Sequence, residues 1–405
     1  MASGVKSGIT IPMDREPQGL PQGQAQERTQ AQAQEEGWGR AAWVYWPPAW
    51  LAALNAHWDR HHRDLPAARG RASWRPWERA LFALPFGFYA ALGLRWARER
   101  LSPRPRRVPL PVAAALGSEA EADPEGCPHC GPRCVESLIL NERYPYLFAR
   151  DLLRPLARRY FRAEFHGLHR IPQEGPTLVY MNHAGMAFPW DFLVLGGELM
   201  LRWGGRVWLR GPGEKVFTRN PIFNFILPRC WLETVGGVEA TFLNLERLYR
   251  HRSLMLYAPE GAAGMAKGWH RRYRLQRFHT SFLKLAAKYK ARLVPAVCLG
   301  GEGLHPFSVN VPMLARLLGF PFFGISPFVP LLLPFPSLLV WSLPVKLRYF
   351  VFDPVELPPA DYGRFTEEDW RALAEEFRQD LQGRVDRLLR AGDSRAVSKA
   401  AGRRL

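Results

Sequence analysis

His183 and Asp191 are the two residues of this chain whose types and placement best suit acid–base chemistry. His183 follows an apolar run at 177–182 that reads as a strand, and the active sites of open α/β folds collect at such strand ends. Gly185 and Pro189 allow the loop between the two residues to fold back. A carboxylate on one imidazole nitrogen fixes the tautomer and leaves the other nitrogen as a general base. The alternatives are a histidine in a solvent-exposed loop and an aspartate that only caps a helix.

Pro259, Glu260 and Gly261 form a second group at the end of another apolar strand, 253–258. Proline and glycine favour a turn. We expect this turn to place Glu260 where the loop of His183 also emerges. The alternative is a turn with a structural role alone.

A basic segment at 267–278 carries Lys267 and four arginines, among them Arg274 and Arg277, interleaved with aromatic residues. Guanidinium and ammonium groups bind phosphate and carboxylate, so the segment is expected to be a phosphate-binding surface. A solvated basic loop is the alternative.

Three cysteines, Cys127, Cys130 and Cys134, lie close to His129, and thiolates at this spacing can chelate zinc or an iron–sulfur cluster. No second pair of ligands lies nearby in the sequence, so we expect a thiol-bearing loop and no metal. The chain has five cysteines. This number is small and odd, so no disulfide framework is expected, and it fits a reducing compartment.

The elements that must position these groups alternate between strands and helices. Apolar runs predict strands at 177–182, 206–210, 253–258, 292–299 and 347–352, and periodic patterns predict helices at 144–162, 191–203, 239–251 and 280–290. Thr366 and Asp369 form a capping box that opens a last helix, ending near 390. This alternation predicts an α/β fold with a mixed, mostly parallel sheet flanked by helices and an N-terminal interfacial helical extension.

Composition divides the chain into five parts. The 405 residues carry a formal charge of +18, which favours polyanionic partners such as an anionic membrane surface. Hydrophobic residues make up 47 %, which excludes a wholly disordered chain. We expect a disordered tail at 1–40, a Trp/Arg-rich membrane-interface region at 41–110, a linker with the cysteines at 111–137, a catalytic domain at 138–390 and a basic tail at 391–405.

Two apolar segments are expected to meet a membrane surface without crossing it. Residues 80–94 are too short for a span, and tryptophan and arginine flank them, as in helices that lie in an interface. A buried helical hairpin is the alternative. Residues 317–345 lack charge but contain six prolines, so a regular membrane-spanning helix is not expected. The better account is an apolar wall that packs on the core, with dipping into the interface left open. No signal peptide is visible at the N-terminus.

The order of these motifs resembles the glycerolipid acyltransferases, the family that includes the lysophosphatidate (1-acylglycerol-3-phosphate) acyltransferases. The resemblance rests on the His183–Asp191 loop, the Pro259–Gly261 turn and the later Val294 and Pro295, each at a strand or strand end. It implies that His183 and Asp191 form the catalytic dyad and that the Pro259–Gly261 turn contacts the acceptor.

The chain departs from the family pattern in three places. Seven residues separate His183 from Asp191, where the family has four, and Ala262 and Ala263 stand where it carries an arginine after the glycine. The family's Gly-x-x-Phe-x-x-Arg block, whose arginine serves the acceptor phosphate, is matched only in part by residues 236–240, without the arginine. Either Arg274 or Arg277 replaces that arginine at an acceptor phosphate, or the acceptor is a neutral hydroxyl compound.

The resemblance therefore implies an O-acyltransferase that uses acyl-CoA or acyl carrier protein as co-substrate and a lysophospholipid or other glycerolipid as acceptor. It implies no cofactor, no metal and no nucleic-acid partner. The protein is expected to be peripheral or monotopic at the cytoplasmic face of a membrane. The alternatives are a catalytically inactive membrane-surface scaffold and, from charge alone, a nucleic-acid-binding protein.

Overall fold

A computed structural model describes most of the chain from residue 47 to residue 392. The described ranges are 47–62, 74–101, 141–185, 188–207, 209–214, 216, 227–228, 231–327, 329–332, 334–335 and 342–392. The predicted tail at 1–40, the linker at 111–137 with its three cysteines, and nearly all of the tail at 391–405 lie outside these ranges.

A seven-stranded sheet lies at the centre, in the order β1-β9-β6-β2-β5-β3-β4. Its strands are β1 (Glu164–His166), β2 (Thr177–Met181), β3 (Leu209–Gly213), β4 (Gly237–Glu239), β5 (Leu254–Tyr257), β6 (Arg292–Leu299) and β9 (Arg348–Val351). Neighbouring strands of this sheet run parallel except β6 and β9. The mixed, mostly parallel sheet predicted from the sequence is thereby confirmed.

The central strands are apolar on both faces because helices cover both sides of the sheet. In β2, Val179 and Met181 belong to one hydrophobic core, and Leu178 and Tyr180 belong to the other. All four side chains are fully buried. Strands buried on both faces read as continuous apolar runs, which is why the sequence shows them clearly.

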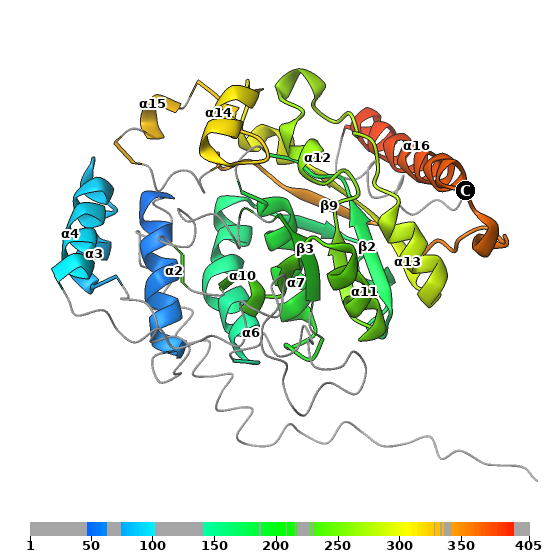
Figure 1. Ribbon diagram of the computed structural model, residues 1–405, viewed down its shortest axis with the longest axis horizontal. Helices are drawn as coiled ribbons and strands as arrows, with labels where there is room; N and C mark the ends of the chain where they lie inside the picture. The colour runs from blue at the N-terminus through cyan, green and yellow to red at the C-terminus, as the bar shows by residue number, and fades with distance from the viewer. Residues whose placement is uncertain are drawn as a thin grey trace, which may run out of the picture. The chain divides into compact units, whose positions relative to one another are not determined.

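Helices form a layer on each face of the sheet (Figure 1). The helices are α2 (Pro47–His62), α3 (Pro76–Leu81), α4 (Gly87–Leu101), α6 (Tyr144–Phe148), α7 (Trp190–Arg202), α10 (Trp231–Thr234), α11 (Phe242–Arg250), α12 (Ala262–Ala266), α13 (Ser281–Tyr289), α14 (Pro312–Leu318), α15 (Val329–Leu332) and α16 (Glu367–Ala391). One core receives side chains from α2, α6 and α7, and the other from α11, α13 and α16.

The long C-terminal helix α16 starts where the sequence predicts. The Thr366 hydroxyl accepts a hydrogen bond from the Asp369 N–H at 3.2 Å, and the Asp369 carboxylate accepts one from the Thr366 N–H at 2.8 Å. This reciprocal pair satisfies two donors that the first turn of a helix leaves free.

Three predicted elements differ in the structure. The strand predicted at 206–210 is β3, which runs further along the chain, to Gly213. The helix predicted at 144–162 is α6 followed by two π-helical segments, Ala149–Leu153 and Leu156–Tyr160. Pro155 lies between these segments and removes a backbone donor, which fits a widened helical turn there.

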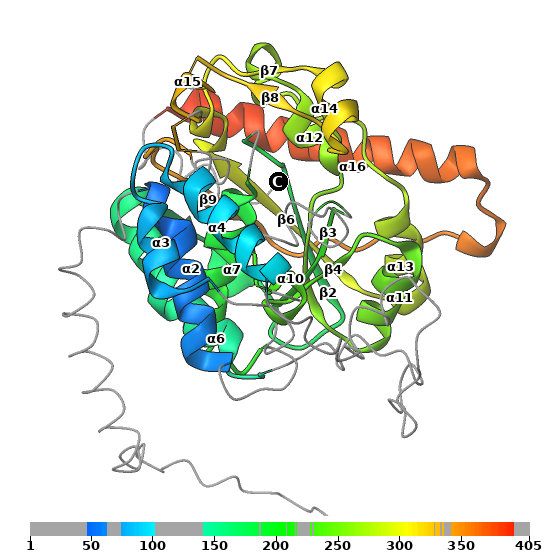
Figure 2. The same cartoon turned by 60° about the vertical axis from the view of Figure 1, so that its left-hand side comes forward.

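The segment predicted at 80–94 is divided between α3 and α4, which pack beside α2 (Figure 2). Phe82 and Phe88 are buried in the core, whereas Phe86 and Trp96 are more than half exposed. The segment therefore has one buried face and one exposed face. No helix within the described ranges is both long and apolar enough to cross a bilayer.

Candidate active site

His183 and Asp191 meet where β2 ends and α7 begins. The Nδ1 atom of His183 lies 2.9 Å from Oδ2 of Asp191, which also accepts the Ala184 N–H at 2.9 Å. Asp191 is fully buried. The contact expected from the sequence is confirmed, and the alternative of an aspartate that only caps the helix is wrong. The helix begins at Trp190, so Asp191 lies in its first turn and directs its carboxylate back to the histidine loop.

Other contacts hold the two chain segments of the dyad in place. The side-chain amide of Asn182 pairs with both backbone groups of Cys298 on β6, accepting at 2.8 Å and donating at 3.0 Å. The Tyr349 hydroxyl on β9 donates to the Asp191 carbonyl at 2.9 Å. Phe192 packs edge-on against the His183 ring, with ring centroids 4.8 Å apart. Strands on one side of β2 therefore anchor both ends of the loop.

Glu260 has a different role from the one expected. Its Oε1 accepts the His183 N–H at 3.0 Å and its Oε2 accepts the Gln276 N–H at 2.7 Å. The residue is fully buried and does not line the cavity described below. Burial raises the pKa of Glu260, while Lys267 and the two N–H donors oppose that shift. The expectation that Glu260 contacts the acceptor is thus corrected, because its carboxylate binds backbone beneath the dyad.

Lys267 also points inward. Its Nζ lies 2.9 Å from Oε1 of Glu302 and donates to the His183 carbonyl at 3.2 Å. Burial lowers the pKa of Lys267, but the Glu260 and Glu302 carboxylates outweigh this and raise it. The ammonium group is therefore charged and committed to internal partners, so the expected contact with an acceptor phosphate is corrected as well.

The remaining predicted binding residues divide between surface and interior. Arg274 and Arg277 are exposed and do not line the cavity, and Pro259 is buried away from it. Gly261, at a φ of +54°, is the one member of the predicted binding group that lines the cavity. The histidine dyad and the Pro259–Gly261 turn do converge at one edge of the sheet, as predicted.

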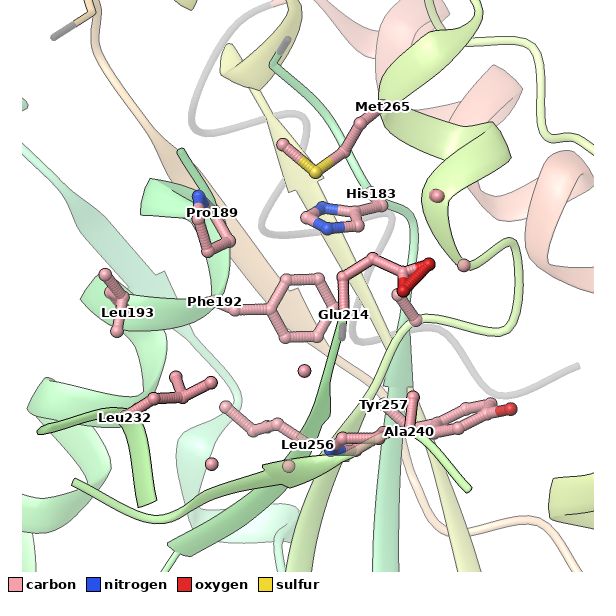
Figure 3. A pocket seen from close by; sticks show the side chains of 18 of the residues that line it. His183, Pro189, Phe192, Leu193, Glu214, Leu232, Ala240, Leu256, Tyr257 and Met265 are labelled. Carbon is pink, nitrogen blue, oxygen red and sulfur yellow. The ribbon is translucent and has the colours of Figure 1, made fainter. Parts of the chain in front are cut away.

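A cavity of about 860 Å³ opens in front of His183 (Figure 3). Apolar side chains and glycines form most of its wall, among them Phe148, Leu153, Phe192, Met200, Leu232 and Met265. Because Nδ1 of His183 is bonded to Asp191, the ring nitrogen left for a substrate is Nε2. An apolar cavity beside a paired imidazole suits a substrate with a long hydrocarbon part.

Sequence reasoning missed two charged residues of the cavity wall. Arg210 on β3 is buried and lines the cavity, and so does Glu214 just after that strand. Arg210 is the last residue of the strand predicted at 206–210, so its place at a strand end was a signal that could have found it, whereas Glu214 lies beyond that predicted end. Within the described ranges, one group of side chains has metal-ligand spacing, and it lies outside this cavity.

Residues 162–299, which include both dyad residues, match the family model described as Acyltransferase. Uncharacterized proteins of Mycobacterium tuberculosis and Mycobacterium leprae are each 30 % identical to the chain over 263 residues. That alignment covers 64 % of this chain and 70 % and 69 % of the two relatives, respectively. The chain belongs to the acyltransferase family.

The resemblance drawn from the motifs is thereby confirmed at the level of the family. Among solved structures, the chain is similar to the 1-acyl-sn-glycerophosphate (LPA) acyltransferase PlsC from Thermotoga maritima, with 15 % identity and a TM-score of 0.38. That match covers 63 % of this chain and 82 % of the other.

Proposed function

We propose that this acyltransferase moves an acyl group from a thioester, acyl-CoA or acyl carrier protein, to the hydroxyl of a glycerolipid acceptor. Nε2 of His183 takes the hydroxyl proton while the oxygen attacks the thioester carbonyl carbon. The tetrahedral intermediate then collapses, the C–S bond breaks, and the imidazolium returns the proton to the thiolate. The products are an ester and a free thiol, and the histidine ends in its starting state.

The observation that carries the proposal is the 2.9 Å contact between His183 Nδ1 and Asp191 Oδ2 at the wall of an apolar cavity. The buried carboxylate fixes the tautomer with a proton on Nδ1 and stabilises the imidazolium that forms. An intact pair in this geometry also counts against the alternative of an inactive scaffold, because the longer loop still brings the two side chains together.

We propose that the acceptor carries a neutral head group. Ala262 and Ala263 line the cavity where the family pattern has an arginine, and Lys267 is bound to internal partners. Among the residues that the structure describes, the charged side chains that line the cavity beside its histidines are Arg210 and Glu214, which have opposite signs. One positive and one negative side chain give this part of the wall no net positive charge to balance a phosphate.

We also propose that the protein works at an anionic membrane surface. Large apolar side chains are exposed on α3, α4 and the turn between them: Trp77, Leu84, Phe86, Tyr89, Leu94, Trp96 and Leu101. Arg100 lies over the Trp96 ring at 4.7 Å. Exposed aromatic and apolar groups beside arginine are typical of a helix that rests in a lipid interface.

The test is a product assay with the full chain and long-chain acyl-CoA, in which mass spectrometry identifies the ester formed. Monoacylglycerol and diacylglycerol are the neutral acceptors, and lysophosphatidate is the charged one. Ester formation with a neutral acceptor supports both proposals. Ester formation with lysophosphatidate alone supports the proposal of acyl transfer and overturns the proposal of a neutral acceptor. No ester from any pair, with acyl carrier protein also tried as donor, overturns the transferase proposal.

A further inference from the structure

Two histidines and an aspartate form a cluster on the side of α2 that faces the catalytic domain. His57 and His61 are four residues apart on α2, so their side chains share one helix face. Asp151 belongs to the π-helical segment Ala149–Leu153, whose first residue lines the cavity. Asp151 itself does not line the cavity, so the cluster is separate from the active site.

The nitrogen and oxygen atoms of this cluster have the spacing of a metal site. Nε2 of His57 lies 3.0 Å from Oδ2 of Asp151, and Nε2 of His61 lies 3.9 Å from the same oxygen. All three residues offer a ligand atom within 4.8 Å of the others. A tetrahedral zinc ion with bonds near 2.0–2.1 Å holds its ligand atoms about 3.3 Å apart. The two observed distances, 3.0 and 3.9 Å, lie on either side of that value.

The atoms that face away from the cluster are already held by hydrogen bonds. Nδ1 of His57 lies 3.4 Å from the Tyr144 hydroxyl, and Oδ1 of Asp151 accepts from Nε of Arg150 at 2.6 Å. Metal-binding histidines and carboxylates are normally oriented by such outer partners. Arg150 also reaches Oδ2 of Asp151 at 3.2 Å, and a cation would take the place of this second contact.

His61 supplies the observation that points to a ligand. Its Nε2 is buried and has no hydrogen-bond partner among the described residues, although it faces the Asp151 carboxylate. A buried polar atom without a partner is uncommon in folded proteins.

We propose that His57, His61 and Asp151 bind one divalent transition-metal ion of the zinc type, which fastens α2 to the wall of the substrate cavity. Two imidazoles and one carboxylate are a ligand set that zinc accepts. The His61 and Asp151 side chains are 20 % and 11 % exposed, which leaves room for water as the fourth ligand. The ion stabilises the N-terminal layer and takes no part in acyl transfer. Sequence patterns do not reveal this group of ligands, because they come from helices about ninety residues apart.

The test uses the full chain without a histidine tag, freed of metal by a chelator and then titrated with Zn²⁺ or Co²⁺. We expect about one ion per chain by elemental analysis, a melting temperature raised by Zn²⁺ but not by Mg²⁺, and the visible d–d bands of four-coordinate Co²⁺. Asp151→Asn and His61→Ala should each weaken binding at least about 100-fold, because lost outer partners alone cost 10–100-fold. His169→Ala, which removes an exposed histidine, is the matched control.

Three results overturn the proposal. In the first, the protein binds no stoichiometric zinc and its melting temperature does not change, so that the cluster is a hydrogen-bonded contact only. In the second, the affinity for Zn²⁺ is unchanged in both Asp151→Asn and His61→Ala. The third is intense thiolate-to-cobalt charge transfer, which would place the ion at cysteines. If His61→Ala fails to fold, two measurements still test the metal site. They are zinc binding by the near-isosteric Asp151→Asn variant and the Co²⁺ spectrum of the unaltered protein.

Discussion

The Asp191 carboxylate holds the His183 imidazole through a 2.9 Å hydrogen bond across a loop with seven residues between them. The same oxygen accepts the Ala184 N–H, so one atom fixes both the ring and the backbone beside it. Glu260 holds the His183 N–H, and Lys267 holds its carbonyl. Side-chain groups therefore bind His183 at its ring, its N–H and its carbonyl, which leaves Nε2 as the group that meets a substrate.

Replacing His183 by alanine should lower the acyl-transfer rate by about 10²–10⁴-fold, the usual contribution of a general base. The fold should survive, because the ring lies at the cavity wall and its loss leaves the buried backbone contacts of the loop in place. Ester formation and far-ultraviolet circular dichroism are the measurements. His270→Ala, at an exposed position of the 3-10 helix Trp269–Arg271 and off the cavity wall, should retain full activity. Undiminished turnover in His183→Ala would rule out the general-base mechanism.

Asp191→Asn tests the tautomer instead of the base. The amide can present its NH₂ group to Nδ1 of His183, which moves the ring proton to Nε2 and blocks proton abstraction there. We expect the rate constant kcat to fall at least about 100-fold with little change in KM, since the substrate-facing wall is untouched. A variant whose loss appears only in KM would show that Asp191 shapes the cavity and does not control the histidine.

Lys267→Met should destabilise the fold by about 3–5 kcal/mol, because it leaves Glu260 and Glu302 buried without their cation. Burial already raises the pKa of Glu260, and loss of Lys267 raises it further. When the pKa of a carboxyl group is higher in the folded state than in the unfolded state, the fold loses stability as the pH rises from the unfolded pKa to the folded pKa. The free energy of unfolding that Lys267→Met loses relative to the unaltered protein should therefore shrink as the pH falls toward and below the pKa of Glu260 in the unfolded state.

Chemical denaturation at several pH values measures this effect. Lys284→Met removes the cation of a more exposed ion pair with Glu367 and should cost less than about 1 kcal/mol. Equal losses in the two variants, or a Lys267→Met deficit that does not change with pH, would contradict the assignment of Lys267 as the counter-charge of buried carboxylates.

Local sequence patterns were sufficient for part of this site and not for the rest. β2, β5 and β6 are continuous apolar runs, so their carboxyl ends, and with them His183 and Glu260, could be placed at one sheet edge. The inward turn of Glu260 and Lys267 could not be foreseen, because it depends on partners from other parts of the chain, such as Glu302. β1 and β4 have three residues each, too few to show a pattern.

Gly264→Ala should impair catalysis although the glycine never touches a substrate. A Cβ atom at this position would lie 2.9 Å from Cβ of Glu260 and 3.0 Å from Cβ of His183, closer than van der Waals contact allows. The histidine loop must shift, and misplacement by about 1 Å costs about 100-fold in rate. Gly93→Ala, in α4 with no atom within 4 Å of the new Cβ, should keep full activity and gain up to about 1 kcal/mol of stability. Unchanged kcat in Gly264→Ala would show that the loop tolerates displacement.

Anionic vesicles should recruit the protein through the exposed face of α3 and α4. Each arginine near such a surface adds about 1 kcal/mol to the binding free energy. The exposed aromatic rings that enter the lipid add an apolar contribution that salt does not screen. Phe86→Asp with Trp96→Asp should abolish sedimentation with phosphatidylserine vesicles at low salt, while Leu389→Asp, at an exposed position on α16, should not. Salt should weaken the binding of the unaltered protein without abolishing it. Failure to sediment at low salt, or equal loss in the α16 variant, would place the membrane contact elsewhere or exclude it.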